Sequence, residues 1–195
     1  MVTRIADMGS AAGEPEEDLP EPVVQLVPMR RRHLRAVLRI ESQVYPRPWS
    51  LPLFMSELNL RATRAYTVAR LNGSVVGYCG LMFTGEDAHV TTIAVDPAHQ
   101  REKIGTRLLL QATRDALAAG CRHLTLEVRM SNVGAQALYR RFGLRPAGVR
   151  KNYYAESNED ALVMWADDID REDYLSRLGE IDESIPGTTL VEPRA

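Results

Sequence analysis

The sequence predicts a single α/β domain with a mixed sheet, and three observations support this class. Apolar runs of strand length alternate with helical patterns in the order β-α-α-β-β-β-α-β-α-β-β. Turns rich in glycine, asparagine and proline separate these runs. The length of 195 residues and the apolar content of 45% suit one domain with a sizeable core.

The first half of the chain predicts a strand, two helices and a hairpin. Residues 23–27 (VVQLV) read as a short strand, and residues 34–44 carry apolar side chains at helical spacing. Two prolines in the string YPRPWS interrupt this helix, and Ser50 can cap a second helix. The run AYTVARLNGSVVGYCGLMF predicts two strands that turn at Asn72-Gly73.

The second half predicts two strand–helix pairs and a last hairpin. The strand AHVTTIAV ends at Asp96-Pro97, and the helix over residues 104–119 stops at Gly120. The strand RHLTLEV is followed by a helix that Ser131 or Asn132 can cap. The strings LRPAGVRKNYY and DALVMWA then predict the final hairpin.

Acidic residues gather at both ends of the chain. Residues 1–22 carry six acids and one base, and residues 167–195 carry nine acids and three bases. Residues 23–166 therefore have a net charge of +9, which suits an anionic ligand or an acidic partner, or an arginine-rich surface balanced by the two ends. We predict a disordered N-terminal segment (1–22), one folded domain (23–166) and an acidic C-terminal tail (167–195), frayed except for one short helix.

Composition also predicts where the protein does not act. No apolar run reaches the roughly 18 residues of a membrane span, and the N-terminus lacks the apolar core of a signal peptide. We therefore expect a cytoplasmic protein without a membrane partner, in which Cys79 and Cys121 are buried, reduced thiols. No metal is predicted, because the four histidines lack metal-ligand spacing: His33, His89, His99 and His123.

The string TIAVDPAHQREKIGTRLL leads from a strand into the start of a helix. A helix N-terminus exposes unpaired backbone N–H groups and the positive end of the helix dipole, so it can hold a pyrophosphate. The P-loop pattern and the three-glycine dinucleotide pattern are both absent. By itself this turn predicts either a weak phosphate site or an ordinary α/β connection.

The same string resembles the cofactor motif of the GNAT superfamily of acetyltransferases, Gln/Arg-x-x-Gly-x-Gly/Ala, through Gln100 and Gly105. The resemblance implies a mostly antiparallel sheet whose strand at residues 93–95 splays from its neighbour and binds the pantetheine arm of acetyl-CoA. The backbone of residues 101–106 would hold the pyrophosphate. The implied cofactor-binding residues are Ile93, Ala94, Val95, Arg101, Glu102, Lys103, Ile104, Gly105, Thr106 and Asn132.

Lys103 stands where the family has the first glycine of this motif. A left-handed backbone at this position would cost lysine about 1 kcal/mol or more, whereas a helical backbone would cost little. We expect the helical backbone, because Arg101, Lys103 and Arg107 would then form a cationic cluster near the phosphates.

Three further strings, LEVRMSNVGAQALYRRFGL, YPRPWS and RKNYYAESNEDALVM, resemble the bacterial RimI-type N-acetyltransferases of ribosomal protein alanine. The resemblance spans roughly residues 24–166. It implies transfer of an acetyl group from acetyl-CoA to a protein N-terminus, above all the N-terminal alanine of a ribosomal protein. We expect direct attack within a ternary complex, because no cysteine is placed to carry the acetyl group.

Acetyl transfer from a thioester to an amine needs a base and an acid. The amine, with a pKa of about 8, must lose a proton that a carboxylate can accept. The resemblance gives this role to Glu127, which could otherwise be an exposed strand end. The leaving thiolate can take a proton from a phenol. The resemblance gives this second role to Tyr139, which could otherwise be a core residue with its hydroxyl at the edge.

Substrate contacts follow from the same resemblance. Asn132 matches the cofactor-binding asparagine and could also be a plain helix cap. As a separate hypothesis, Asp160 or Glu159 could meet a protonated amino terminus or a basic substrate residue. Three aromatic residues match loops at the peptide entry or pack as ordinary side chains: Trp49, Tyr153 and Tyr154.

Other functions stay open at this point. A second GNAT activity would use other protein N-termini, lysine side chains or a small amine. A non-catalytic acyl-CoA-binding module is the alternative from another class, and the presence of both Glu127 and Tyr139 counts against it. A nucleic-acid binder is disfavoured because no binding motif accompanies the basic charge, so no nucleic-acid partner is predicted. The sequence does not determine the oligomeric state.

Overall fold

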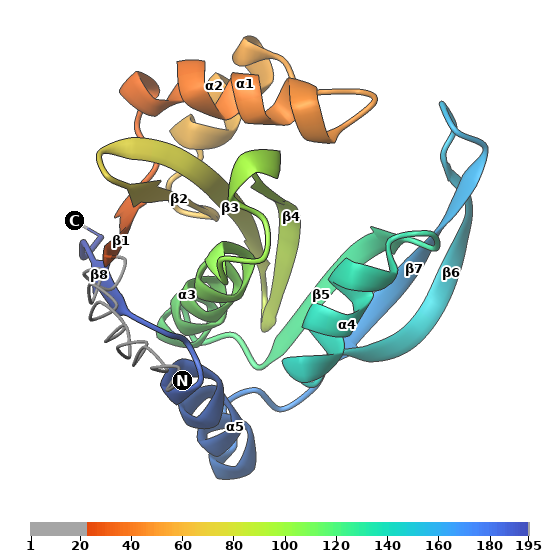
Figure 1. Ribbon diagram of the computed structural model, residues 1–195. Coiled ribbons are helices and arrows are strands. Elements are labelled where there is room, and N and C mark those ends of the chain that lie inside the picture. The colour runs from red at the N-terminus through yellow and green to blue at the C-terminus, as the bar shows by residue number, and fades with distance from the viewer. Residues whose placement is uncertain (1–22, 195) are drawn as a thin grey trace, which may run out of the picture.

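The computed structural model describes residues 23–194, and the predicted disorder of residues 1–22 lies outside them. The strands are β1 (Val23–Pro28), β2 (Arg64–Leu71), β3 (Ser74–Thr84), β4 (Asp87–Val95), β5 (His123–Arg129), β6 (Arg145–Tyr154), β7 (Glu159–Ala166) and β8 (Thr188–Val191). The helices are α1 (Leu34–Val44), α2 (Leu51–Asn59), α3 (Ile104–Ala118), α4 (Val133–Arg141) and α5 (Glu172–Glu183). Up to β7 this order is the predicted one (Figure 1).

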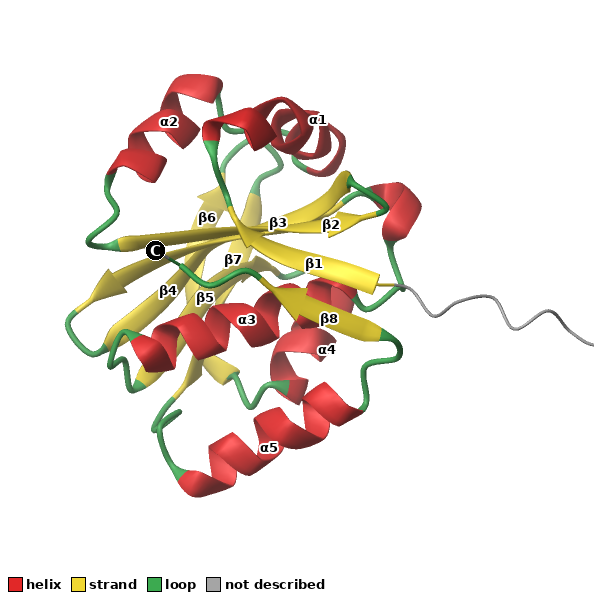
Figure 2. Cartoon of the chain, turned by 90° about the vertical axis from the view of Figure 1, so that its left-hand side faces the viewer, coloured by secondary structure: helices red, strands yellow, loops and turns green. Residues whose placement is uncertain are grey.

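All eight strands form one sheet in the order β6-β7-β5-β4-β3-β2-β1-β8. Only the pairs β4–β5 and β1–β8 are parallel, so the prediction of a mixed, mostly antiparallel sheet is confirmed. Helices α1 and α2 cover one face, and α3, α4 and α5 cover the other (Figure 2). Each face has its own apolar cluster, around Phe54 on the first and around Leu108 and Phe142 on the second. Among the described residues, no helix has the length and apolarity needed to cross a membrane.

Local signals in the sequence act as expected at the turns and caps. Asn72 and Gly73 both have positive φ, 49° and 81°, as a two-residue hairpin turn requires. The Ser50 hydroxyl accepts a hydrogen bond from the Leu53 backbone at 3.4 Å and caps α2. Gly120 follows α3 with a φ of 80°, a conformation that glycine adopts without strain.

Strands β4 and β5 pair over four residues and then diverge. The last pair joins Val90 to Leu126, although β4 continues to Val95 and β5 to Arg129. The register of β3 with β4 shifts at the same level and leaves Thr91 as an extra residue. Such a bulge bends its strand, so β4 turns away from β5 where their pairing ends (Figure 1). The splayed strand expected from the resemblance is therefore present.

A tyrosine ring supports this bulge from the neighbouring strands. The Tyr66 hydroxyl lies 3.3 Å from the Thr91 hydroxyl and donates a hydrogen bond to Glu57 at 2.8 Å. The ring packs so closely over Gly80 that a Cβ there would lie 2.3 Å from Tyr66 Cε1. A side chain at position 80 would clash with the Tyr66 ring, so glycine is required there. This packing supports the bulge of β4 at the point where β4 and β5 separate.

The C-terminal residues pack onto the sheet and do not fray. The predicted short helix is α5, and its buried Tyr174, Leu178 and Ile181 join the cluster of α3 and α4. Strand β8, which the sequence did not predict, pairs in parallel with β1. The expectation of a frayed tail is therefore wrong for residues 167–194, because three apolar side chains of α5 are buried against α3 and α4.

Arg107 is placed differently from the expectation. We expected it beside the phosphates, but it is 2% exposed and belongs to the interior of α3. Its guanidinium donates hydrogen bonds to the Thr189 hydroxyl and the Pro186 carbonyl, both in the C-terminal segment. The hydrogen bonds of this buried guanidinium thus connect the segment of β8 to α3, the helix whose N-terminus is the predicted phosphate site.

Candidate active site

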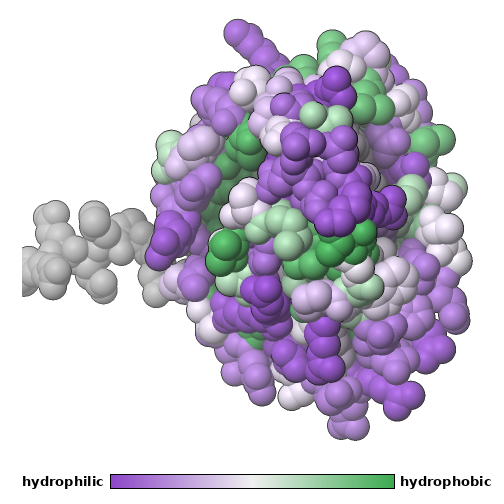
Figure 3. Space-filling model, turned by 90° about the vertical axis from the view of Figure 1, so that its right-hand side faces the viewer, coloured by the Kyte–Doolittle hydropathy of each residue, from purple (hydrophilic) through white to green (hydrophobic). Residues whose placement is uncertain are grey.

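A cavity of about 480 Å³ lies at the fork between β4 and β5. Its walls come from α1 and the loop after it, β4, β5, the start of α4 and the β6–β7 hairpin. Figure 3 faces the β6–β7 side of the molecule and shows hydrophobic residues gathered across its middle, framed by hydrophilic ones. The cavity brings together seven of the predicted site residues: Trp49, Ile93, Glu127, Asn132, Tyr139, Tyr153 and Tyr154.

Glu127 lies near the end of β5, inside this cavity, and its side chain is only 8% exposed. One carboxylate oxygen lies 3.0 Å from His89 Nε2, and the other lies 2.9 Å from an Arg150 guanidinium nitrogen. The hydrogen bond from His89, together with the nearby positive charges, lowers the pKa of Glu127 below its usual value, although burial opposes this. The group is therefore a buried, ionised carboxylate with both oxygens engaged.

Tyr139 lies on α4 and is 6% exposed. Burial raises the pKa of its phenol above its ordinary range, and the neighbouring phenols and the Cys79 thiol act in the same direction. The raised pKa keeps the phenol protonated at neutral pH, so it carries a proton that it can donate. Glu127 and Tyr139 thus present a proton acceptor and a proton donor to the same cavity.

Asn132 occupies the N-terminus of α4 at the mouth of the fork. Its side-chain oxygen accepts a hydrogen bond from the Ala135 backbone at 3.1 Å, so Asn132, and not Ser131, caps the helix. The side-chain amide nitrogen remains available to a ligand in the cavity. The two roles considered for this residue are compatible in this geometry.

The N-terminus of α3 carries no side-chain cap. The first backbone N–H groups of the helix, at Ile104, Gly105 and Thr106, have no helical acceptor, because the first helical bond runs from Arg107 to Lys103. A Cβ on Gly105 would come within 3.6 Å of Leu138 and 3.7 Å of Val95, so α3 packs closely on α4 and β4. An uncapped helix end of this kind is suited to an anion.

The conformation expected for Lys103 is wrong. Lys103 has a φ of 59° and a ψ of 13°, which is left-handed, and Arg101 is also left-handed with a φ of 73°. The turn before α3 thus has a conformation that glycine adopts without strain, and the lysine adopts it at a cost of roughly 1–2 kcal/mol. This turn orients the unpaired N–H groups at the start of α3, which form the predicted phosphate site. The backbone strain therefore lies at that site.

This strain leads to a first testable prediction. Lys103→Gly relieves the left-handed strain, and we expect the free energy of unfolding to rise by about 1 kcal/mol in urea denaturation. Lys103→Asn serves as the matched variant, because asparagine tolerates this conformation and also removes the charge. Both variants should bind coenzyme A a few times more weakly in calorimetry. A less stable Lys103→Gly protein would contradict the strain.

Several residues that sequence analysis missed also organise the cavity. The Tyr45 hydroxyl donates a hydrogen bond to the Ile93 carbonyl on the splayed strand at 2.7 Å. The buried Glu41 carboxylate accepts a hydrogen bond from the Trp49 backbone at 2.9 Å, and burial raises its pKa to about 7. Tyr45 lies within the string YPRPWS, which was a usable signal. The Glu41 contact spans eight residues of irregular chain and had no signal.

The acidic residues proposed to meet the amino terminus lie outside this cavity. Asp160 accepts hydrogen bonds from Lys151 at 2.7 Å and from the Asn152 backbone at 2.8 Å. Glu159 binds Arg129 and the Ser131 backbone. Neither carboxylate lines the cavity, so the structure does not bring them to Glu127 and Tyr139.

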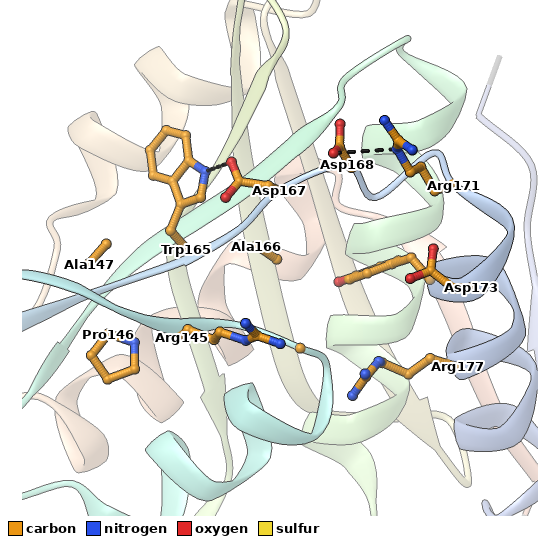
Figure 4. Close-up of a pocket in the computed structure, with 12 residues that line it drawn as sticks. Arg145, Pro146, Ala147, Trp165, Ala166, Asp167, Asp168, Arg171, Asp173 and Arg177 are labelled. Atoms are coloured by element: carbon orange, nitrogen blue, oxygen red, sulfur yellow. Dashed lines mark hydrogen bonds and ion pairs between the residues drawn. The ribbon is translucent and has the colours of Figure 1, made fainter.

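A second cavity, of about 540 Å³, lies between the β6–β7 strands and α5 (Figure 4). Trp165 donates a hydrogen bond to Asp167 at 2.7 Å, and Asp168 pairs with Arg171 at 3.4 Å. The phenol of Tyr174, which also lines it, donates to the Phe142 carbonyl. This cavity contains none of the predicted catalytic residues, so we place the chemistry in the first one.

Comparison with known proteins agrees with this geometry. The profile of the Acetyltransferase (GNAT) family matches residues 34–144, which is more than half of the 195 residues. The chain belongs to the GNAT family and is an N-acetyltransferase. Enzymes of this family use acetyl-CoA.

Its relatives define the branch of the family. A ribosomal protein bS18-alanine N-acetyltransferase of Escherichia coli is 34% identical over 138 residues, covering 67% of this chain and 88% of the relative. The N-alpha-acetyltransferase RimI of Mycobacterium tuberculosis is 36% identical over 145 residues, covering 71% and 89%. The chain is thus a RimI-like member of the family.

Solved structures show the same fold. The crystal structure of the Escherichia coli ribosomal-protein-S18-alanine N-acetyltransferase has a TM-score of 0.68 at 31% identity, covering 74% of this chain and 94% of that chain. Arabidopsis thaliana Naa50, in complex with the bisubstrate analogue CoA-Ac-MVNAL, has a TM-score of 0.63 at 19% identity, covering 73% and 97%. At that identity the second comparison concerns the fold alone.

Proposed function

We propose that this enzyme acetylates the N-terminal amino group of a protein, in the first place the N-terminal alanine of a ribosomal protein. The observation that carries the proposal is the joint position of Glu127 and Tyr139 in one cavity at the fork of β4 and β5. The names of the two bacterial relatives supply the substrate class. The catalytic unit is the predicted domain, residues 23–166, with residues 167–194 packed against it.

Acetyl-CoA fits the two parts of the site that lie on either side of the fork. The unpaired N–H groups at the start of α3 suit its pyrophosphate, and the edge of β4 from Ile93 to Val95 suits its amide-bearing arm. The Tyr45 hydroxyl binds the Ile93 carbonyl, so this loop residue would lie beside an arm bound along β4. Asn132 faces the same space from α4.

The chemistry needs a neutral amine and a protonated leaving group. Glu127, buried and ionised, accepts a proton from the amine directly or through one water. The neutral amine, whose first proton has gone to solvent, attacks the thioester carbonyl within a ternary complex. A carbon–nitrogen bond forms, the carbon–sulfur bond breaks, and the proton released by the nitrogen is the one that Glu127 accepts. Tyr139 protonates the departing thiolate, because its phenol stays neutral at working pH.

Aromatic side chains form the entrance for the peptide. Tyr153 and Tyr154 meet edge to face at 5.2 Å, and the Arg129 guanidinium lies 3.9 Å from the Tyr154 ring centre. Trp49 approaches from the other side, on the loop that Glu41 holds through its backbone. Such a rim can close over an extended peptide and exclude water from the reacting groups.

The experiment uses two peptides of the same sequence with one internal lysine, one with a free N-terminal alanine and one with this terminus blocked. We expect mass spectrometry to find one acetyl group on the free peptide, at the α-amine, and none on the blocked peptide. Acetylation confined to the lysine would replace the proposal with the side-chain activity. Absence of thiol release with peptides and small amines alike would favour an acyl-CoA-binding module.

A further inference from the structure

His89 forms a dyad with Glu127 across the fork. His89 lies on β4, its Nε2 is 3.0 Å from the Glu127 carboxylate, and both side chains line the cavity. The pairing of β4 with β5 stops one residue beyond His89, at Val90. The imidazole and the carboxylate therefore face each other where the two strands separate, and the His89 side chain is still 24% exposed.

The carboxylate alone is a poor final acceptor for the protons of this reaction. An α-amine is largely an ammonium ion in solution and becomes an amide, so its nitrogen loses one proton to solvent before attack and a second proton during attack. Glu127 has both oxygens engaged, by His89 and by Arg150, and these partners favour its ionised form. A proton placed on Glu127 is therefore held weakly, and a second acceptor beside it is chemically useful.

An imidazole bound in this way can be that acceptor. A neutral imidazole that donates its Nε2 proton to Glu127 keeps a free lone pair on Nδ1. A carboxylate behind one ring nitrogen fixes the tautomer and stabilises the imidazolium that forms when the other nitrogen takes a proton. The geometry of His89 and Glu127 matches the base-and-carboxylate half of that arrangement.

We propose that His89 is a further catalytic residue of acetyl transfer, and that the proton of the substrate amine passes to its imidazole while Glu127 remains ionised. The proposal rests on the proposed function and changes the destination of one proton. The amine attacks in its neutral form, after its first proton has gone to solvent, and its second proton moves to His89 Nδ1, directly or through one water. The nitrogen electron pair forms the new carbon–nitrogen bond, and the carbon–sulfur pair leaves with sulfur. Tyr139 protonates the sulfur and regains a proton from His89 through solvent.

Other charged groups share the cavity and must be separated from His89 by experiment. The most relevant is Glu41, whose pKa burial raises to about 7. Burial raises the pKa of Tyr139, so its phenol stays protonated near that pH. The remaining charged and titratable groups of the lining are Tyr45, Arg47, Glu127, Arg129, Tyr153, Tyr154 and Glu156, and Arg150 contacts Glu127 from β6.

The test compares the pH dependence of kcat/KM, from about pH 5.5 to 9, for wild type and His89→Gln with an alanine-terminated peptide. Two groups must be neutral in the wild type, the amine and the imidazole, so log(kcat/KM) should approach a slope of about two at the acid end. Glutamine can still donate a hydrogen bond to Glu127 but cannot titrate. We expect about a 10- to 100-fold lower kcat in His89→Gln and a slope of about one.

Two controls make the result specific. His123→Gln is the matched variant, because His123 is also 24% exposed and pairs with a carboxylate, Asp167, at 3.1 Å, but lies outside the cavity. It should keep the slope of about two, as should Glu41→Gln. A His89→Gln protein with wild-type kcat and slope would show that the pair of His89 with Glu127 has only a structural role, and this result would overturn the proposal. Failure of wild type to acetylate the α-amine would instead overturn the proposed function.

Discussion

Glu127→Gln should lower kcat by about 10²- to 10³-fold while coenzyme A binds within about twofold of wild type. Glutamine keeps the size of the side chain and can still contact Arg150, so the cavity stays intact. What is lost is the negative charge that accepts or stabilises the proton leaving the amine. Steady-state kinetics with an alanine-terminated peptide, together with calorimetry of coenzyme A, measure the two effects separately.

Glu86→Gln is the control for this experiment. Glu86 is exposed in the turn between β3 and β4, outside the cavity, and its substitution should leave kcat unchanged. An unchanged kcat in Glu127→Gln would exclude Glu127 from the chemistry. A loss of coenzyme A binding equal to the loss of kcat would instead show that the carboxylate supports the fold of the site.

A chain that ends at Ile185 should be less stable than the full chain by about 3 kcal/mol or more. The truncation removes β8 and both hydrogen-bond acceptors of the Arg107 guanidinium, at Pro186 and Thr189. It leaves a charged group that is 2% exposed without a partner, and a buried unpaired charge is among the most costly defects in a protein. Urea denaturation of both chains measures the difference.

A double-mutant cycle identifies the cause of this loss. Arg107→Met removes the charge, so the truncation should cost clearly less in the Arg107→Met background than in the wild-type background. Glu192→Gln is the surface control, because its pair with Arg30 is exposed on both sides and should change the stability by less than about 1 kcal/mol. Equal truncation costs in both backgrounds would show that other contacts of the removed segment, strand pairing and the bonds of Arg194 to Asp115 and Thr67, cause the loss, and not Arg107.

Local patterns in the sequence were sufficient for most elements, and the resemblance to a known family supplied the proposed catalytic pair. The Asn72-Gly73 turn, the Ser50 cap and the glycine after α3 act through their neighbours in sequence, so they could be predicted. Glu127 and Tyr139 were predicted through the resemblance to a known family. A turn and two helical turns separate them in the sequence, so both side chains were expected to face the gap beside the splayed strand. That spacing is local, and the fold preserved it.

Long-range contacts decided what the sequence pattern missed. His89 and Arg150 meet Glu127 from two other strands, and their positions depend on the sheet order and on the bulge at Thr91. The left-handed backbone of Lys103 was mispredicted because the turn is set by how α3 packs on β4 and α4, and not by the preference of lysine.

The sequence by itself therefore determined the element order through its periodicity, and the family through its resemblance to known proteins, which also supplied the proposed carboxylate–phenol pair. Only the tertiary structure decided that the C-terminal segment is part of the core. Arg107 looked like a phosphate ligand because its neighbours in sequence are basic. Its actual partners lie 79 and 82 residues away, and a buried charge binds whatever acceptors the fold brings to it.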